Sequence, residues 1–161
     1  MIPLLTFLIF SLSALNSSSI SAASLGSTQS VAVSGTLTCE GKPAVGVRVD
    51  LMESDNNGDN SGIVDMDDFM NFTVSDQNGF FKTSGSEVEI SGIEPYVNVF
   101  HKCSDGLNPC QRVLRINIPK SATTSGSSPL ETFSIGTFEL AGKLLGELRS
   151  CLYRNLTASS P

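Results

Sequence analysis

Residues 31–51 read VAVSGTLTCEGKPAVGVRVDL and contain two runs in which apolar and polar side chains alternate. The first run, 31–39, and the second, 45–51, have the period of two that places apolar side chains on one face of a β-strand. Between them, Gly41 permits the backbone of a turn and Pro43 presets it. The simplest local prediction is a β-hairpin made of the two runs.

Further alternating runs follow at short, regular spacing. They cover 69–75, 80–82, 96–101, 114–118 and 133–140. Turn-forming residues separate them, and no stretch shows a sustained helical period, although 142–149 is long enough for one helical turn. Short strands with this punctuation predict an all-β fold, an antiparallel β-sandwich of about seven strands.

The amino terminus has the composition of an export signal. Residues 2–15 are almost wholly apolar, yet shorter than the roughly 20 residues that span a bilayer. The small residues Ser21 and Ala23 fit cleavage after Ala23, while an uncleaved anchor is the alternative. The expected localisation is secreted, in the extracellular space or at the cell surface. The predicted boundaries are a signal peptide at 1–23, a flexible lead at 24–30, the domain at 31–152 and a polar tail at 153–161.

Charge is unevenly distributed along the 161 residues. Ten Lys and Arg face 16 Asp and Glu, a net charge of −6, which argues against a nucleic-acid binder. Residues 101–161, however, hold seven basic and four acidic residues. We expect a basic edge there that contacts an anionic phospholipid or an acidic partner, with an ordinary mixed surface as the alternative. The cations of this expected edge are Lys102, Arg112, Arg115 and Lys120.

Four cysteines behind an export signal predict two disulfides. Cys103 and Cys110 flank the turn-forming run SDGLNP, so a local bridge between them is the favoured pairing, which leaves Cys39 with Cys151. Three pairings remain open from the sequence alone. A metal site is disfavoured because the chain has no C-x-x-C pair.

The acidic segment 55–68 is predicted to be a solvated loop. Its opening resembles an EF-hand, but the pattern fails at Asn60 and Met66. A looser Ca²⁺ site through Asp65, Asp67 and Asp68 is the alternative. If it exists, Ca²⁺ is expected to raise the melting temperature of the protein. Asn-x-Ser/Thr sequons predict N-glycosylation at Asn71 and Asn155, in agreement with secretion.

The chain resembles the nematode transthyretin-like protein family over about 31–151. The segment PYVNVFHKC at 95–103 and the following PCQR at 109–112 are the most specific, and the opening GTLTCEGKPA at 35–44 agrees with them. One departure is Phe100, where the family usually has Tyr. The resemblance implies a transthyretin (prealbumin)-like β-sandwich with two disulfides. It implies little about chemistry, because most members have no assigned reaction and some are regarded as extracellular bridging proteins.

We therefore expect a secreted, non-enzymatic binding or bridging protein that acts on a protein receptor, a host protein or an anionic lipid, without a cofactor. An extracellular carrier of a small apolar ligand is the alternative. Transthyretin-like sandwiches include a purine-degradation hydrolase that relies on two histidines and a terminal Tyr-Arg-Gly-Ser. Here His101 is the sole histidine, and Tyr153-Arg154 is followed by Asn155-Leu156. No catalytic residue is expected, and His101 is interpreted as a packed side chain beside the disulfides, with a pH switch as the alternative.

Overall fold

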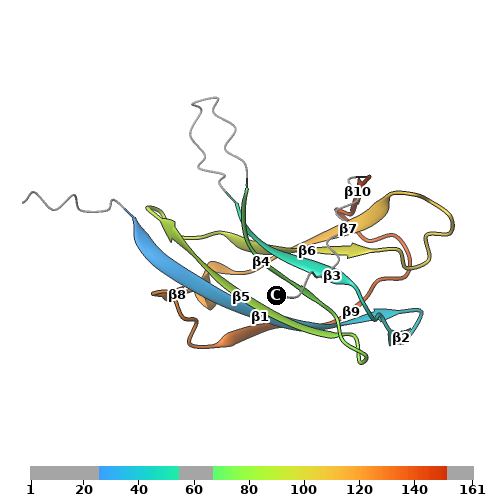
Figure 1. Cartoon of the computed structure of the whole chain (residues 1–161), viewed down its shortest axis with the longest axis horizontal. Coiled ribbons are helices and arrows are strands. Elements are labelled where there is room, and N and C mark those ends of the chain that lie inside the picture. Colours follow the sequence, from blue (N-terminus) through green and yellow to red (C-terminus); the bar gives the residue numbers. More distant parts are fainter. Residues whose placement is uncertain (1–25, 55–66, 152–161) are drawn as a thin grey trace, which may run out of the picture.

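The structure, a computed structural model, describes residues 26–54 and 67–151. Two β-sheets stack face to face, with their strands running along the length of the molecule (Figure 1). The elements are β1 (Ser27–Cys39), β2 (Lys42–Pro43), β3 (Arg48–Glu53), β4 (Asp68–Val74), β5 (Phe80–Glu89), β6 (Pro95–His101), β7 (Gln111–Asn117), the 3-10 helix η1 (Lys120–Ala122), β8 (Thr124–Ser125), β9 (Thr132–Glu139) and β10 (Leu148–Ser150). Within these ranges, no helix has the length and apolar character needed to cross a membrane.

Sheet A is organised around β1, which pairs with β5 on one side and with β8 and β9 on the other. Sheet B has the order β10-β7-β6-β3-β4 and is antiparallel throughout. The β-sandwich prediction is confirmed, with one departure: β9 runs parallel to β1. The reason is that β8 runs antiparallel to β1, and the chain reverses direction over 126–131 before β9 begins.

The predicted hairpin between 31–39 and 45–51 is wrong. β1 turns back into the two-residue β2, whereas β3 lies in sheet B between β4 and β6. Leu37 and Leu51 are both fully buried, one from each sheet. Alternation predicts that both runs bury one face, but it does not distinguish a hairpin from two strands that face each other across a core.

Gly79 lies against β1 at the point where the chain arrives from β4 in sheet B and enters β5 in sheet A. Its carbonyl oxygen accepts a hydrogen bond from the Leu37 nitrogen at 2.8 Å, and the Ala44 nitrogen donates to the Leu37 oxygen at 2.9 Å. Gly79 has φ +73°, and a Cβ there would lie 2.2 Å from the Leu37 oxygen. Only glycine suits this position, because both the backbone angle and the contact exclude a side chain.

The structure corrects the predicted flexible lead at 24–30 over residues 27–30. Ser27–Ser30 form the start of β1 and pair with Ser86–Glu89 of β5. Ser30 is fully buried, and its hydroxyl donates to the Thr124 oxygen at 3.5 Å. The polar composition suggested a loop, but β1 has strands on both sides here, and backbone pairing outweighs the weak strand propensity of these residues. The predicted signal peptide at 1–23 lies outside the described residues.

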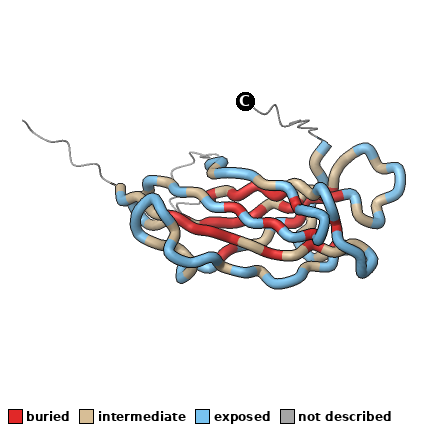
Figure 2. Tube along the Cα trace, turned by 60° about the horizontal axis from the view of Figure 1, so that its bottom comes forward, coloured by how far each residue is buried: buried red, intermediate tan, exposed pale blue. Residues whose placement is uncertain are grey.

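The core lies between the two sheets, where Figure 2 shows the buried stretches running side by side. It is made of inward-facing aliphatic residues from both sheets together with Phe81 of β5. The principal members are Val31, Val33, Leu37, Val49, Leu51, Val97, Val99, Leu114 and Leu140.

Candidate binding surface at the disulfide end

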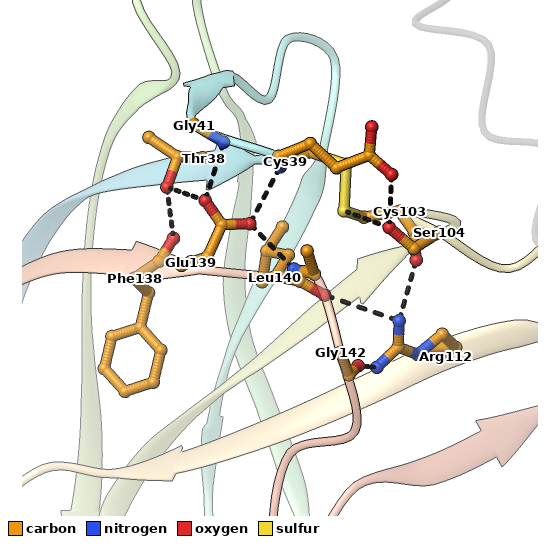
Figure 3. Close-up of a disulfide and its surroundings, with 12 residues drawn as sticks. Thr38, Cys39, Gly41, Cys103, Ser104, Arg112, Phe138, Glu139, Leu140 and Gly142 are labelled. Carbon is orange, nitrogen blue, oxygen red and sulfur yellow. Dashed lines mark hydrogen bonds between the residues drawn. A yellow bond between two sulfur atoms is a disulfide. The ribbon is translucent and has the colours of Figure 1, made fainter.

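One end of the sandwich combines both disulfides with three connecting segments. We define it as the disulfide end: the turn at 40–41, the loop at 102–110 and the loop at 140–147. Cys39, the last residue of β1, is bonded to Cys103, and Cys110 is bonded to Cys151. The first bridge therefore ties sheet A to sheet B (Figure 3).

This connectivity corrects the favoured pairing of Cys103 with Cys110. Val97, Val99 and His101 are buried at alternate positions of β6, and Cys103 continues the same parity toward sheet A. It meets Cys39 there, with 5.7 Å between the Cα atoms. The short separation of Cys103 and Cys110 along the chain does not decide the pairing. Cys103 follows β6 and meets Cys39, whereas Cys110 precedes β7, whose partner β10 ends next to Cys151.

Arg112 lies at the centre of the disulfide end. Its guanidinium forms a bidentate ion pair with Glu147, with Nη2 at 2.6 Å from Oε2. It also donates to the carbonyl oxygens of Cys103 at 2.7 Å, Leu140 at 3.4 Å and Gly142 (Figure 3). The two ion-paired side chains are 6% and 9% exposed. The hydrogen bonds from Arg112 lower the pKa of Glu147 and keep it ionised. One buried cation thus holds both loops.

Further polar contacts fix the loop at 102–110. Arg149 donates two hydrogen bonds to Asp105, at 2.6 and 2.9 Å, and these hydrogen bonds lower the pKa of Asp105. The Lys102 Nζ donates to the backbone oxygens of Asn108 at 2.7 Å and Pro109 at 3.1 Å. The loop is therefore held by Lys102 from within, by Arg149 of β10 and by Arg112 of β7. It presents a fixed surface.

Glu139 fixes the turn at 40–41. Its carboxylate accepts hydrogen bonds from the backbone nitrogens of Ala141 at 2.8 Å, Gly41 at 3.0 Å and Glu40 at 2.9 Å, and from the Thr38 hydroxyl at 2.9 Å (Figure 3). These donors, the Ala141 nitrogen first, lower the pKa of Glu139 from 4.5 to about 2. The carboxylate thus accepts the hydrogen bonds of two turn nitrogens, those of Glu40 and Gly41, that a neighbouring strand would otherwise accept.

A pH dependence of stability follows from Glu139. Its pKa is lower in the folded than in the unfolded chain, so its contribution is present in full above the ordinary value of 4.5 and is lost as pH falls toward about 2. Glu139→Gln is therefore expected to lower stability at pH 6 and to flatten the decline between pH 4.5 and 2. Urea unfolding across this range tests it, with Glu131→Gln, an exposed glutamate just before β9, as the control. Equal slopes in both variants would contradict the assignment.

His101 is 3% exposed, as expected of a packed side chain. Neither ring nitrogen has a hydrogen-bond partner among the described residues. Burial, followed by the nearby Arg112, lowers the pKa of His101, while Glu147 and Asp105 oppose that shift. The lowered pKa favours the neutral form of the ring. Among the described residues, no nucleophilic side chain forms a hydrogen bond with it.

The four expected basic residues do not form one edge. Arg112 is interior, and Lys102 belongs to the loop at 102–110. Arg115 instead stacks on Tyr96, with its Cζ 3.4 Å from the ring centroid, and lies 3.3 Å from Asp67. Lys120 pairs with Glu94 at 2.7 Å. The structure therefore separates them into two pairs: Lys102 and Arg112 at the disulfide end, and Arg115 and Lys120 in a shallow pocket of about 270 Å³.

The acidic candidates are only partly described. Asp65 and Asn155 lie outside the described residues. The Asp67 carboxylate accepts a 2.5 Å hydrogen bond from the Tyr96 hydroxyl, and burial followed by this bond raises the pKa of Tyr96. Asp68 is the exposed first residue of β4. Over 26–54 and 67–151, no three His, Cys, Asp or Glu side chains are placed to hold a metal ion.

Sequence reasoning missed two leucines at this end. Leu107, in the loop at 102–110, and Leu145, in the loop at 140–147, are fully exposed, and Leu148 of β10 is 67% exposed. A leucine beside a turn glycine, Gly106 or Gly146, is the available sequence signal. Because Arg112 and the disulfides fix the loops, the leucines are presented to solvent on a rigid frame.

The structure also contains a pocket of about 360 Å³ lined by 121–124 and 130–134. Serine and threonine supply most of its lining. A carrier of an apolar ligand needs a mostly apolar cavity, so this pocket gives that alternative no support.

Comparison with known proteins agrees with this architecture. The model of the Transthyretin-like family matches residues 34–119. Transthyretin-like protein 1 of Caenorhabditis elegans is 67% identical over 147 residues, which cover 91% of this chain and 94% of that protein. Transthyretin-like protein 2 of the same organism is 58% identical over 128 residues, 80% of this chain and 86% of that protein. Among solved structures, a 9R-lipoxygenase from Cyanothece matches with a TM-score of 0.38 and 16% identity over 69% of this chain and 16% of its own, which is too weak to support an inference.

Proposed function

This chain belongs to the transthyretin-like family, and from that premise we propose that it is a secreted, non-enzymatic binding protein. It acts in the extracellular space or at the cell surface, on a protein receptor or an anionic lipid. The observation that carries this proposal is the disulfide end, where the fully exposed Leu107 and Leu145 stand on loops that Arg112 and both disulfides hold in place.

A rigid loop binds its partner at a lower entropic cost than a mobile one. The buried Arg112–Glu147 pair and the Arg149–Asp105 contact involve neither Leu107 nor Leu145. The leucines are therefore free to enter an apolar pocket of a receptor or the outer part of a lipid layer. Binding through fixed loops on a β-scaffold is a common use of such folds.

Replacing both leucines tests the surface. Leu107→Ser with Leu145→Ser is expected to weaken partner binding about tenfold or more, because each buried leucine contributes roughly 1.5–3 kcal/mol. The measurement is affinity capture from extracellular fluid followed by mass spectrometry, together with cosedimentation with vesicles that contain an anionic phospholipid. Leu130→Ser is the matched control, since Leu130 is 84% exposed but lies outside the disulfide end.

Two results would contradict the proposal. One is capture and cosedimentation by the double variant at wild-type levels, and the other is an equal loss with Leu130→Ser. Secretion is tested separately by expressing the full chain in eukaryotic cells. The medium is expected to contain a product that begins at Ser24.

A further inference from the structure

β4 and β5 form an open side of the sandwich. β4 is the last strand of sheet B and pairs only with β3, while β5 pairs only with β1 in sheet A. Each therefore has one side without a strand partner in the described part of the chain. The two edges lie next to each other, because Met70 of β4 packs so tightly on Gly85 of β5 that a Cβ there would lie 2.8 Å from the Met70 Cβ.

The outer face of β4 is apolar. Phe69 is 48%, Phe72 38% and Val74 49% exposed, and the two phenyl rings lie 6.5 Å apart. Asp68 is the only charged residue of the strand. An exposed, hydrophobic edge strand is a template for pairing with another chain, and proteins usually protect such edges with Lys, Pro or other charges. In the described part of this edge, protection is limited to a register shift opposite Leu51 and Met52, to Asp68 at the start of the strand and to Arg48 of β3, whose Cζ lies 4.4 Å from the centroid of the Phe72 ring.

The glycosylation sequon lies at this edge. Asn71 is exposed, and its Nδ2 donates to the Ser84 oxygen of β5 at 2.7 Å, while its Oδ1 accepts a hydrogen bond from the Phe72 nitrogen at 2.8 Å. The amide therefore stands between the two open edges. Attachment of a sugar to Nδ2 leaves one N–H and the carbonyl oxygen in place.

We propose that an N-linked glycan on Asn71 covers the adjoining edges of β4 and β5 and keeps the protein monomeric. The inference rests on the secretion that the proposed function includes. The donor is an oligosaccharide on a polyprenyl diphosphate. Its sugar C1–O bond to phosphate breaks, a C1–Nδ2 bond forms, Nδ2 gives up one proton and the polyprenyl diphosphate leaves. The hydrated glycan then shields the part of the strand beyond Asp68, which carries no charge of its own.

Occupancy is tested on the full chain expressed in eukaryotic cells behind a well-characterised leader in place of residues 1–23. Peptide mass spectrometry is expected to find the glycan on Asn71 in the wild type and in Thr73→Ser, which preserves the sequon, and to find none in Asn71→Gln. An unmodified Asn71 in secreted protein would overturn the proposal. Because the leader is supplied, failure of the native residues 1–23 to direct export counts against the proposed function and not against this site.

Protection is tested by light scattering after size exclusion at increasing protein concentration. Asn71→Gln is expected to self-associate at concentrations about tenfold lower than the wild type, and adding Phe72→Glu to it is expected to restore the monomer. Trimming the glycan of the folded wild type with an endoglycosidase gives a second route if Asn71→Gln folds poorly. Asn155→Gln, which removes the other sequon, is the control. If both the Asn71→Gln variant and the trimmed wild type stay monomeric at all concentrations, the glycan does not protect the edges and the proposal is wrong.

Discussion

Replacing Arg112 with methionine is expected to lower the free energy of unfolding by about 3–5 kcal/mol, because Glu147 then remains buried without its cation. The loss includes more than one ion pair. The carbonyl oxygens of Cys103 and Gly142 lose their donor at the same time, and an unsatisfied buried acceptor is itself costly. Chemical denaturation at neutral pH measures the change.

The matched control is Lys120→Met, which breaks the exposed pair with Glu94, whose side chains are 60% and 44% exposed. It is expected to cost less than about 1 kcal/mol. Adding Glu147→Gln to Arg112→Met is expected to recover part of the loss, because it removes the stranded charge. An effect of Arg112→Met no larger than that of Lys120→Met would show that Arg112 does not hold the disulfide end.

Removal of the Cys39–Cys103 bridge by a double alanine substitution is expected to cost about 4 kcal/mol in the chain-entropy model. The bridge closes a span of 64 residues, and the unfolded chain regains that freedom when it is removed. The local Cys103–Cys110 bridge favoured by the sequence would close a much shorter loop and stabilise about half as much. With that pairing, however, the Cys39 and Cys103 double variant would also break the bridge from Cys39 to Cys151, so a loss well above about 4 kcal/mol would indicate the alternative connectivity.

The second bridge supplies the comparison. Cys110 and Cys151 are 41 residues apart, so their joint replacement is expected to cost nearly as much, about 4 kcal/mol. With the alternative pairing, each of these double variants would remove one cysteine from each bridge, so both variants would lose the two crosslinks together and show an equal loss of about 7 kcal/mol. Non-reducing peptide maps of the wild type are expected to join Cys39 to Cys103.

The strands were predictable because alternation is a local property. The runs at 31–39, 96–101 and 133–140 each became a strand, since apolar side chains at every second position can be buried together only in extended backbone. The sheet to which each strand belongs was not predictable in this way. It depended on contacts such as that of Gly79 with Leu37, which join residues far apart along the chain.

The candidate site was less predictable than the fold. Arg112 was expected on the surface as a cation, although its parity with Leu114 and Ile116 placed it on the inward face of β7. Its partner Glu147 lies 35 residues further along, and no local pattern connects the two. Arg115, of opposite parity, is exposed as the alternation predicts. Arg112 can therefore be buried on the inward face of β7 because Glu147 and three backbone carbonyls pair with its guanidinium.

The disulfide connectivity has a consequence for proteolysis. Cys39–Cys103 lies wholly before the segment 104–109, and Cys110–Cys151 wholly after it. A single cut in that segment would leave two pieces without any covalent link, each carrying its own crosslink and contributing strands to both layers. The two pieces would separate on a non-reducing denaturing gel yet remain associated in native buffer. The residues around Leu107 are thus the position at which one cleavage would convert the chain into two complementary fragments.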